Sequence, residues 1–429
     1  MMNILVVGGG LNSFVSASLF ASVGNTVYFN SFGCSISRYQ LEPGLESLFK
    51  EQVEVGRIVE ISTTNQKLEE SYEIIVLGEE VETYSLEDID WTIKFTLDQA
   101  IWILLSPSDI GEAIYWKKRL NSRNNGNGST VKNCIDVISC PLLIREGRAL
   151  EDFSRPELIT LGCDTECSAI RVKALMYPFN RQKDDIKIVS TKEAEFACFA
   201  SHAMLATRLS FMNEMAALAE KTGVDIDVIR ACIGSDPRIG SSYLYPGCGY
   251  GGATLSKNLQ RISSKLKRRN DDLGLLDIVA EINNRQKDLL FRKIWHFFGG
   301  SLKGKVIAVW GVSFKPETDS IEGAPALQLI ESLTAQQAEI VFYDPMAKQN
   351  AIEYFAEREI SVKATDRAMD ACDNADVLVV CTEWKELWNP SFAELAARLR
   401  CKAIFDGRNI YGPDQVKLAG LKYFGIGRQ

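Results

Sequence analysis

The residues near the amino terminus with the clearest chemical potential belong to a glycine run that follows a short apolar stretch. Glycines spaced as G-x-G-x-x-G allow bare backbone N–H groups and a helix N-terminus to bind a dinucleotide pyrophosphate. Gly8 and Gly10 supply the first two glycines, Leu11 and Asn12 follow, and Ser13 takes the place of the third. The segment therefore predicts a dinucleotide site whose helix must pack against its strand through a serine.

The end of the next expected strand lacks the acidic residue that grips the adenosine ribose hydroxyls in such sites. Asn30 and Ser31 stand there instead. Three interpretations stay open: weakened or lost NAD binding, a preference for NADP in which Ser31 and Arg38 meet the extra phosphate, and a Rossmann fold kept without tight cofactor binding. The cofactor prediction is thus NAD or NADP, held by a weakened motif.

The elements that must position these residues follow from the periodicity of the chain. Residues 3–7, the glycine turn, a helical stretch at 15–23 and a strand at 26–29 have the length of a dinucleotide-binding βαβ unit. Further strands are expected at 73–77, 102–105, 135–138 and 158–161, and, after a strongly helical region, at 305–310, 338–343, 377–381 and 403–405. The predicted class is α/β, with two Rossmann-like doubly wound domains joined by a central helical domain.

Composition and charge exclude several classes of protein. The chain has 429 residues, enough for two or three cores, and a formal net charge of −8, which argues against binding to nucleic acid or an anionic membrane. Its 11 cysteines show no paired CxxC spacing, so neither a metal site nor a disulfide framework is predicted. The sequence contains no long uncharged apolar run, so no membrane-spanning helix is predicted. A reducing cytoplasm is the expected location.

Several motifs are spread over nearly the whole chain. One is the glycine-rich segment from Pro246 to Asn258, and the others are QLEPGLE (40–46), REG (145–147), LATRLSFMNE (205–214), DPRIG (236–240), FKP (314–316), YDP (343–345), TEW (382–384) and DGRN (406–409). In type and in order these motifs resemble those of the nucleotide-sugar 6-dehydrogenases, the UDP-glucose/GDP-mannose dehydrogenase family, and the segment from Pro246 is similar to that family's active-site loop, G-x-G-F-G-G-S-C-F-x-K-D. The resemblance implies shared ancestry and a shared fold.

The family's reaction, as the resemblance implies, oxidises the C6 alcohol of the sugar to a carboxylate with two NAD, through an aldehyde trapped on a cysteine thiol. Thr254 stands at the position of that cysteine and Asn258 at that of an aspartate, while the helper positions fall on Leu142, Cys198 and His202. A threonine hydroxyl is a poor nucleophile and leaves slowly. These five replacements predict a non-catalytic homologue that cannot make the uronate and has a binding or scaffold role.

An alternative prediction keeps the chain an enzyme. An NAD(P)-dependent oxidoreductase that performs a single two-electron hydride transfer on a nucleotide sugar needs no thiol, and His202 would then serve as general acid or base near neutral pH. Cys198 lies four residues from His202 on an expected helix, so the imidazole would lower the thiol pKa. The competing interpretation is that both fill space vacated by a lysine and an asparagine.

Nucleotide recognition is expected to survive these changes. By the resemblance, a UDP-sugar is the expected substrate, and the predicted substrate-binding residues are Arg238, Tyr250, Gly251 and Lys257. The predicted cofactor-binding residues are Gly8, Gly10, Leu11, Asn12, Ser31, Lys315 and Arg408. For Lys315 and Arg408, ion pairing with carboxylates is an equally open role.

Three domains follow from the periodicity and the resemblance together. Residues 1–185 are predicted to form a dinucleotide-binding domain, residues 186–298 a central helical domain, and residues 299–429 a nucleotide-sugar-binding domain. The central helices are expected to form a homodimer. A further protein partner is left open.

Overall fold

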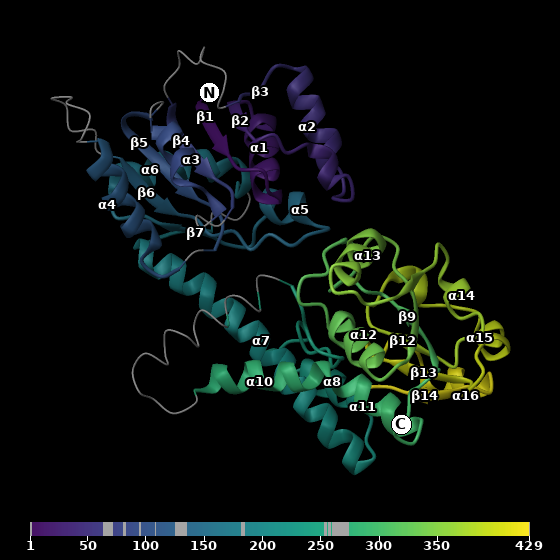
Figure 1. Ribbon diagram of the computed structural model, residues 1–429. Helices are drawn as coiled ribbons and strands as arrows, with labels where there is room; N and C mark the ends of the chain where they lie inside the picture. The colour runs from purple at the N-terminus through teal and green to yellow at the C-terminus, as the bar shows by residue number, and fades with distance from the viewer. Residues whose placement is uncertain are drawn as a thin grey trace. The chain divides into compact units, whose positions relative to one another are not determined.

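The computed structural model describes residues 2–62, 72–79, 83–93, 96–107, 109–124, 135–181, 185–252, 255, 259 and 274–428. The chain divides into two compact units, Met1–Ala200 and Ser201–Gln429. Each unit contains one β-sheet with helices packed against it (Figure 1). The predicted α/β class with two Rossmann-like sheets is confirmed, whereas the division into three domains stays a prediction.

The sheet of the first unit has eight strands in the order β3-β2-β1-β4-β5-β6-β7-β8. Neighbouring strands are parallel except β6 and β7. The strands are β1 (Asn3–Val7), β2 (Thr26–Asn30), β3 (Ile58–Glu60), β4 (Tyr72–Leu77), β5 (Thr96–Leu104), β6 (Asp136–Ser139), β7 (Ile159–Gly162) and β8 (Ile186–Val189). Chain order reverses at β1, whose neighbours are β2 and β4, so the carboxyl ends of β1 and β4 lie side by side.

Helices connect these strands, as parallel strands require. They are α1 (Leu11–Ser22), η1 (Ile36–Tyr39), α2 (Leu45–Glu54), α3 (Leu86–Ile93), α4 (Glu112–Asn124), α5 (Ala149–Ser154), α6 (Glu166–Met176) and η4 (Tyr177–Phe179). Apolar runs form the strands because both faces of the sheet are covered. Along β1, Ile4 and Val6 belong to one buried cluster, and Leu5 and Val7 belong to another on the opposite face.

The sheet of the second unit has six parallel strands in the order β11-β10-β9-β12-β13-β14. This is the 3-2-1-4-5-6 order of a dinucleotide-binding fold. The strands are β9 (Val306–Trp310), β10 (Glu339–Tyr343), β11 (Lys363–Ala364), β12 (Val377–Val380), β13 (Ala403–Asp406) and β14 (Lys422–Phe424). The helices among them are α12 (Pro325–Ala335), α13 (Lys348–Ala356), α14 (Ala368–Ala371), η5 (Lys385–Leu387), α15 (Phe392–Arg398) and α16 (Pro413–Leu418).

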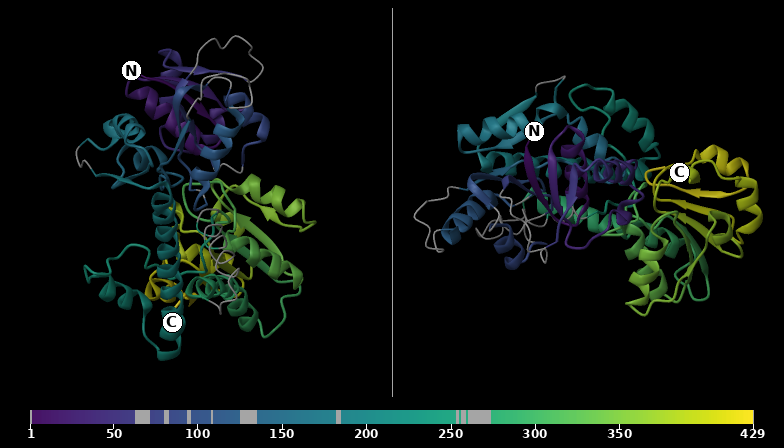
Figure 2. Two further views of the ribbon diagram at one scale, coloured as in Figure 1. Left: turned by 90° about the vertical axis from the view of Figure 1, so that its left-hand side faces the viewer. Right: turned by 90° about the horizontal axis from the view of Figure 1, so that it is seen from above.

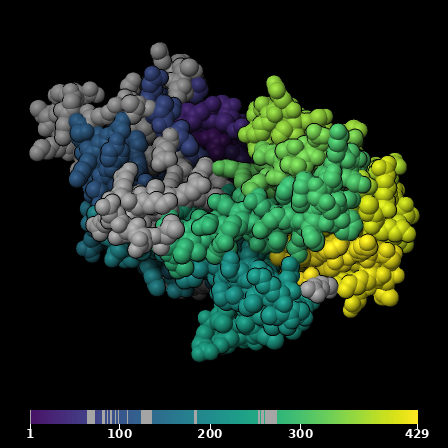
Figure 3. All heavy atoms as spheres, turned by 60° about the horizontal axis from the view of Figure 1, so that its bottom comes forward, coloured from purple at the N-terminus to yellow at the C-terminus, as the bar shows by residue number. Residues whose placement is uncertain are grey.

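Helices dominate the region between the two sheets, as predicted. The long helix α7 (Thr191–Thr222) is uninterrupted in Figure 2, and it is followed by α8 (Ile226–Gly234), α10 (Leu275–Lys287) and α11 (Leu289–Phe297). The expected single helix over 273–298 is in fact two, with a break at Asp288. Within the second unit, Ser210 of α7 donates to the Val279 carbonyl of α10 at 3.1 Å, and Lys293 of α11 pairs with Glu220 at 2.5 Å. The space-filling view shows the corresponding teal and green surfaces adjoining (Figure 3).

Candidate functional site

The predicted phosphate loop lies between β1 and α1 in the first unit. Gly8 has φ +135°, a conformation that favours glycine, and its N–H donates to the Asn30 carbonyl at 2.9 Å. Tyr39 donates to the Gly9 carbonyl at 3.0 Å, and Asn12 donates to Ser106 Oγ at 2.9 Å. The loop therefore has the backbone course of a dinucleotide loop and is held from several sides.

A carboxylate from the neighbouring strand fills this loop. Glu79, two residues beyond the end of β4, accepts from the Ser13 N–H at 3.1 Å, while Ser13 Oγ lies 2.5 Å from its Oε2. Tyr84 donates to the same oxygen at 3.1 Å. A Cβ built on Gly8 would lie 1.8 Å from Glu79 Oε2, and one on Gly10 would lie 2.4 Å from Oε1. The loop residues fit a dinucleotide diphosphate, but not while this carboxylate occupies the space.

Burial raises the pKa of Glu79 above its ordinary value, although hydrogen bonds from Ser13 and Tyr84 oppose the rise. A carboxylate withdrawn from water costs free energy unless donors surround it. Here the donors include the Ser13 N–H in the first turn of α1, where a diphosphate would also accept hydrogen bonds. Glu79 thus acts as an internal anion at the helix N-terminus.

At the end of β2, Asn30 and Ser31 stand where a dinucleotide-binding fold commonly has an acidic residue. Asn30 is buried, its Oδ1 accepts from the Phe32 N–H at 3.0 Å, and its Nδ2 has no hydrogen-bond partner within the described part of the chain. Ser31 turns back so that its carbonyl accepts from Cys34 N at 3.0 Å. Arg38 is exposed, with Nη1 3.9 Å from Cys34 Sγ.

The second predicted site is the glycine loop after Pro246, in the second unit. Asn213 of α7 accepts from the Gly247 N–H at 2.9 Å, and Gln286 of α10 donates to the Gly247 carbonyl at 2.6 Å. Asn283 of α10 accepts from the Tyr250 N–H at 2.9 Å and donates to its carbonyl at 3.1 Å. The side-chain amides of α7 and α10 thus form the hydrogen bonds that hold the backbone of this loop. Thr254, Lys257 and Asn258 lie outside the described residues.

The C-terminal sheet approaches the same loop closely. A Cβ on Gly251 would lie 2.6 Å from the Gly323 carbonyl oxygen, so only glycine fits there. The Gly252 N–H donates to the Glu322 carbonyl at 2.8 Å, and the Cys248 N–H donates to the Gly407 carbonyl at 2.8 Å. Residues 246–252 are all buried, which makes the loop part of the unit's core rather than an open surface.

Cys248 is the thiol within this loop. The neighbouring Cys381 thiol and the Arg408 guanidinium lower its pKa to about 7, although burial alone would raise it. Its Sγ lies 3.9 Å from the Cys381 carbonyl oxygen, and the residue is buried. The guanidinium thus favours the Cys248 thiolate, while the surrounding protein encloses the side chain.

Arg408 ties the loop to the sheet. Its Nε donates to the Cys381 carbonyl at 2.7 Å and lies 3.2 Å from Glu383 Oε2, while Nη1 donates to the Gly249 carbonyl at 3.1 Å. Lys315 is half-buried, with its ammonium 5.5 Å from the centre of the Phe314 ring.

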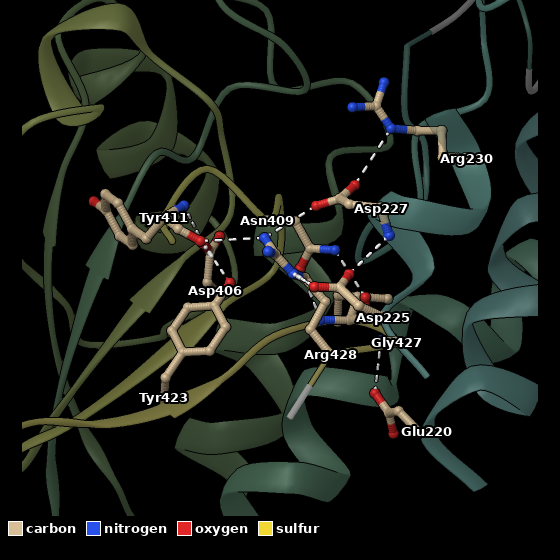
Figure 4. Close-up of polar contacts among 11 residues, drawn as sticks. Glu220, Asp225, Asp227, Arg230, Asp406, Asn409, Tyr411, Tyr423, Gly427 and Arg428 are labelled. Carbon is tan, nitrogen blue, oxygen red and sulfur yellow. Dashed lines mark hydrogen bonds and ion pairs between the residues drawn. The ribbon is translucent and has the colours of Figure 1, made fainter. Parts of the chain in front are cut away.

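The segment that carries Arg408 is fixed by the end of the chain (Figure 4). Asp406 is fully buried and accepts from Tyr411 N at 3.0 Å and from Tyr423 at 3.1 Å, and burial raises its pKa to about 6. Asn409 forms a pair of 2.8 Å hydrogen bonds with the backbone of Ile426. Two residues further on, Arg428 reaches the N-terminus of α8.

The predicted helper positions are buried. Leu142 follows β6, and its N–H donates to the Leu105 carbonyl at 3.0 Å. Cys198 and His202 lie on α7, one turn apart. Burial raises the pKa of Cys198 to about 12 and lowers the pKa of His202 to about 4. Both shifts run against activation of the thiol by the imidazole and against titration of His202 near neutral pH, because desolvation disfavours both charged forms.

Of the predicted substrate residues, Tyr250 and Gly251 are buried in the loop and Arg238 is on the surface. The Arg238 side chain is 87% exposed and pairs with Asp236 at 2.6 Å. Arg208 of α7 shapes the same segment by donating to the carbonyls of Ile239, Gly240 and Ser242 at 2.8–2.9 Å.

Several supporting side chains were absent from the sequence predictions. These are Glu79, Arg208, Asn213, Asn283 and Gln286. Asn213 lies within the family-like LATRLSFMNE motif, which was a usable signal. Glu79 lies in no recognised motif.

Two doubly wound, mainly parallel sheets, the first with a glycine loop after its first strand, define an α/β protein with dinucleotide-binding topology. Residues 192–285 match the central domain of the UDP-glucose/GDP-mannose dehydrogenase family, and residues 308–413 match its UDP binding domain.

Whole-chain similarity extends these matches. The chain is 32% identical to a UDP-glucose 6-dehydrogenase of Pseudomonas aeruginosa, over 100% of this chain and 98% of the relative. It is 30% identical to a UDP-glucose 6-dehydrogenase of Bacillus subtilis, with 100% and 98% covered. A UDP-glucose dehydrogenase structure from Pyrobaculum islandicum has the same fold, with a TM-score of 0.84, 23% identity, and 100% and 98% covered. The chain belongs to the UDP-glucose/GDP-mannose dehydrogenase family.

The prediction of a non-catalytic homologue, unable to make a uronate, is contradicted by these relatives, which match end to end and are UDP-glucose 6-dehydrogenases. That prediction judged five positions by residue type alone. Two of them, Thr254 and Asn258, lie outside the described residues, and hydride transfer itself requires bound reactants rather than a particular nucleophile.

The described residues were also compared with the requirements of a metal site and of a membrane-spanning helix. Within the described ranges, no three His, Cys, Asp or Glu side chains gather closely enough to hold a metal ion. Among the helices described, none is long and apolar enough to cross a membrane.

Proposed function

We propose that the chain is an NAD(P)-dependent oxidoreductase that acts on the sugar of a nucleotide sugar, with a UDP-sugar as the first candidate. The observation that carries the proposal is the similarity, from end to end, to relatives described as UDP-glucose 6-dehydrogenases. The rigid loop at 246–252 supports it, because hydrogen bonds from α7, α10 and the C-terminal sheet fix its backbone. A preorganised backbone can bind a substrate at low entropic cost.

The proposed reaction is a single two-electron oxidation. Bound NAD(P) would supply the hydride acceptor, so that an alcohol becomes an aldehyde with release of one proton. This step needs no thiol, in keeping with Thr254 at the position that matches the family's cysteine. Weak cofactor binding is part of the same proposal, because Ser13 and Asn30 depart from the dinucleotide motif.

The proposed binding residues remain those that the motifs indicate. For the substrate they are Arg238, Tyr250, Gly251 and Lys257; for the cofactor they are Gly8, Gly10, Leu11, Asn12, Ser31, Lys315 and Arg408. Arg238 is the most direct to test, because its guanidinium is exposed and suits a phosphate. Arg238→Ala is expected to raise KM for the nucleotide sugar. Arg358→Ala is the matched control, since Arg358 is a surface arginine 3.7 Å from Glu331 and outside the proposed site.

The deciding experiment measures the reaction itself. The purified protein is incubated with UDP-glucose, UDP-N-acetylhexosamines and GDP-mannose, each with NAD⁺ or NADP⁺, while reduced dinucleotide is followed by absorbance and the sugar product by mass spectrometry. One reduced dinucleotide per aldehyde formed is the expected result. Two per uronate would overturn the two-electron proposal and leave nucleotide-sugar oxidation standing. No turnover with any pair would overturn the function.

We also propose a homodimer through the central helices. Met204, Phe211 and Leu218 lie seven residues apart along α7 and are 61%, 49% and 52% exposed. Residues at this spacing share one helix face, which supports contact with a second apolar surface. Light scattering of the wild type is expected to give twice the mass of one chain, and Phe211→Glu to reduce it. Leu418→Glu, at a residue 88% exposed on α16, is the control, and a monomeric wild type would refute the proposal.

A further inference from the structure

The loop between β1 and α1 contains an anion of its own. At the switch point of the sheet, the carboxyl ends of β1 and β4 are adjacent, with Val7 paired to Leu77. The chain after β4 therefore passes the amino end of α1, and Glu79 meets Ser13 across a sequence distance of 66 residues. A ligand at such a switch point would bind where this carboxylate lies.

The contacts of Glu79 are those of a bound anion. One oxygen accepts from the Ser13 N–H, and the other lies within hydrogen-bond distance of Ser13 Oγ and Tyr84. Both oxygens lie where any atom added to Gly8 or Gly10 would collide with them. A diphosphate that used the same N–H groups would overlap the carboxylate and would also be repelled by its charge.

The presence of Ser13 in the loop is accounted for by its contact with Glu79. A third glycine has no side chain to hold a carboxylate, whereas the Ser13 hydroxyl is fully buried between the Val7 carbonyl, at 3.2 Å, and Glu79. The serine that weakened the motif in the sequence is thus a ligand for the internal anion. The serine in place of the third glycine and the carboxylate inside the loop thus belong to one interaction.

We propose that Glu79 occupies the dinucleotide diphosphate position in the free protein, so that a dinucleotide binds only when this side chain leaves the loop. The inference rests on the proposed function, because it assigns a dinucleotide to this loop. It makes Glu79 a determinant of cofactor affinity, in competition with the cofactor for the same hydrogen-bond donors. The affinity for the cofactor then depends on how much more favourably its diphosphate than the Glu79 carboxylate binds at the N-terminus of α1.

The test compares binding of ADP-ribose and NADH, by calorimetric titration, to the full-length wild type, Glu79→Ala and Glu79→Gln. Glu79→Ala, which empties the loop, is expected to bind both at least tenfold more tightly than the wild type. Glu79→Gln, which keeps the shape but removes the charge, is expected to fall between. Glu195→Gln is the matched control: Glu195 caps the N-terminus of α4 through the N–H groups of Gly111 and Ala113, at 2.6 and 2.9 Å, and is expected to stay within twofold of the wild type.

A second measurement needs no variant. Binding of ADP-ribose to the wild type is measured from pH 8 to pH 5. Burial raises the pKa of Glu79, so binding is expected to tighten as the pH falls and the carboxylate takes up a proton. Tyr84, whose pKa is raised well above 10, and Tyr39, whose pKa burial raises to about 12, do not titrate in this range. The remaining charged or titratable groups around Tyr39 are Arg38, Cys34 and Glu146. Their contribution is separated by repeating the titration with Glu79→Gln, in which the pH dependence should be lost.

The outcomes separate this inference from the proposed function. Equal affinities in wild type and both Glu79 variants, with no pH dependence in the wild type, would overturn the inference while leaving the function standing. Tighter binding by the variants without sugar oxidation by any protein would support the inference and overturn the function. Folded proteins that bind neither ADP-ribose nor NADH would overturn both.

Discussion

Ser13 Oγ lies 2.5 Å from Glu79 Oε2, and the Ser13 N–H donates to the other oxygen of the same carboxylate. A residue in the first turn of α1 and one just after β4 thus form hydrogen bonds with each other at the amino end of α1. The pairing has an energetic consequence beyond cofactor binding, because a hydrogen bond to a charged, partly buried group contributes more to stability than a neutral one.

A double-mutant cycle with Ser13→Ala and Glu79→Ala is expected to show coupling of about 1–3 kcal/mol in the free energy of unfolding. Each single variant loses the interaction, so the double variant should be more stable than the sum of the two effects predicts. Urea unfolding followed by circular dichroism provides the measurement. Additive effects would mean that the 2.5 Å contact contributes nothing measurable.

His202 is expected to make stability depend on pH. Burial lowers its pKa in the folded chain from 6.5 to about 4. The unfolded chain therefore binds a proton between pH 6.5 and 4 that the folded chain does not, and the free energy of unfolding falls as the pH drops through this window. The loss approaches about 3 kcal/mol near pH 4 and is absent above pH 6.5.

His202→Leu should flatten this part of the profile, measured by urea unfolding at a series of pH values. A slope of the same size in the variant would assign it to other groups. Activity near neutral pH is not expected to follow this titration, because the imidazole stays neutral there.

The organisation of both sheets was largely predictable from the sequence, whereas the position of Glu79 in the loop between β1 and α1 was not. Uninterrupted apolar runs predicted β1, β4 and β9, because central parallel strands bury both faces. The strands β3, β8, β11 and β14 were missed, since they are two to four residues long and carry exposed polar residues.

The position of Glu79 in the site could not be predicted from the sequence. Its position depends on the placement of β4 beside β1, and no local pattern encodes that placement. Cys198 and His202 show a related limit: their spacing on one helix was predicted, but the direction of both pKa shifts depends on burial by the rest of the fold. Residue types indicated a family, and only packing indicated which side chains can ionise.

Gly251→Ala is expected to destabilise the second unit by about 1–3 kcal/mol. The added Cβ would lie 2.6 Å from the Gly323 carbonyl oxygen and 3.0 Å from Ala324 N, and neither backbone atom can move like a flexible side chain. Thermal unfolding measures the effect, and UDP binding by calorimetry should weaken in parallel. Gly412→Ala is the control, because its Cβ would meet nothing nearer than 3.6 Å. Equal melting temperatures for the two variants would contradict the close approach.

Arg408→Ala is expected to lower the free energy of unfolding by about 2–4 kcal/mol. Arg408→Lys is expected to show most of that loss. One ammonium cannot reach the carbonyls of Cys381 and Gly249 together with Glu383, as the planar guanidinium does. Urea unfolding compares both variants with Arg358→Ala, at an exposed ion pair expected to contribute less than about 1 kcal/mol. A fully stable lysine variant would show that the guanidinium geometry is unimportant.

Arg428→Ala is expected to release the end of the chain from α8. Arg428 Nε lies 3.1 Å from Asp225, Nη1 lies 3.0 Å from Asp227, and the side chain is only 13% exposed (Figure 4). Removing a partly buried guanidinium takes this cation from Asp225 and leaves Asp227 with Arg230 alone, at 3.3 Å, which should cost about 1–3 kcal/mol. Hydrogen exchange should increase at the Ile226 and Gly427 amides, which hydrogen-bond to the Gly427 carbonyl and to Glu220. Arg428→Lys is the matched comparison and should recover part of the loss through its charge. If exchange at both amides stays at the wild-type rate in Arg428→Ala, the backbone hydrogen bonds alone hold the chain end.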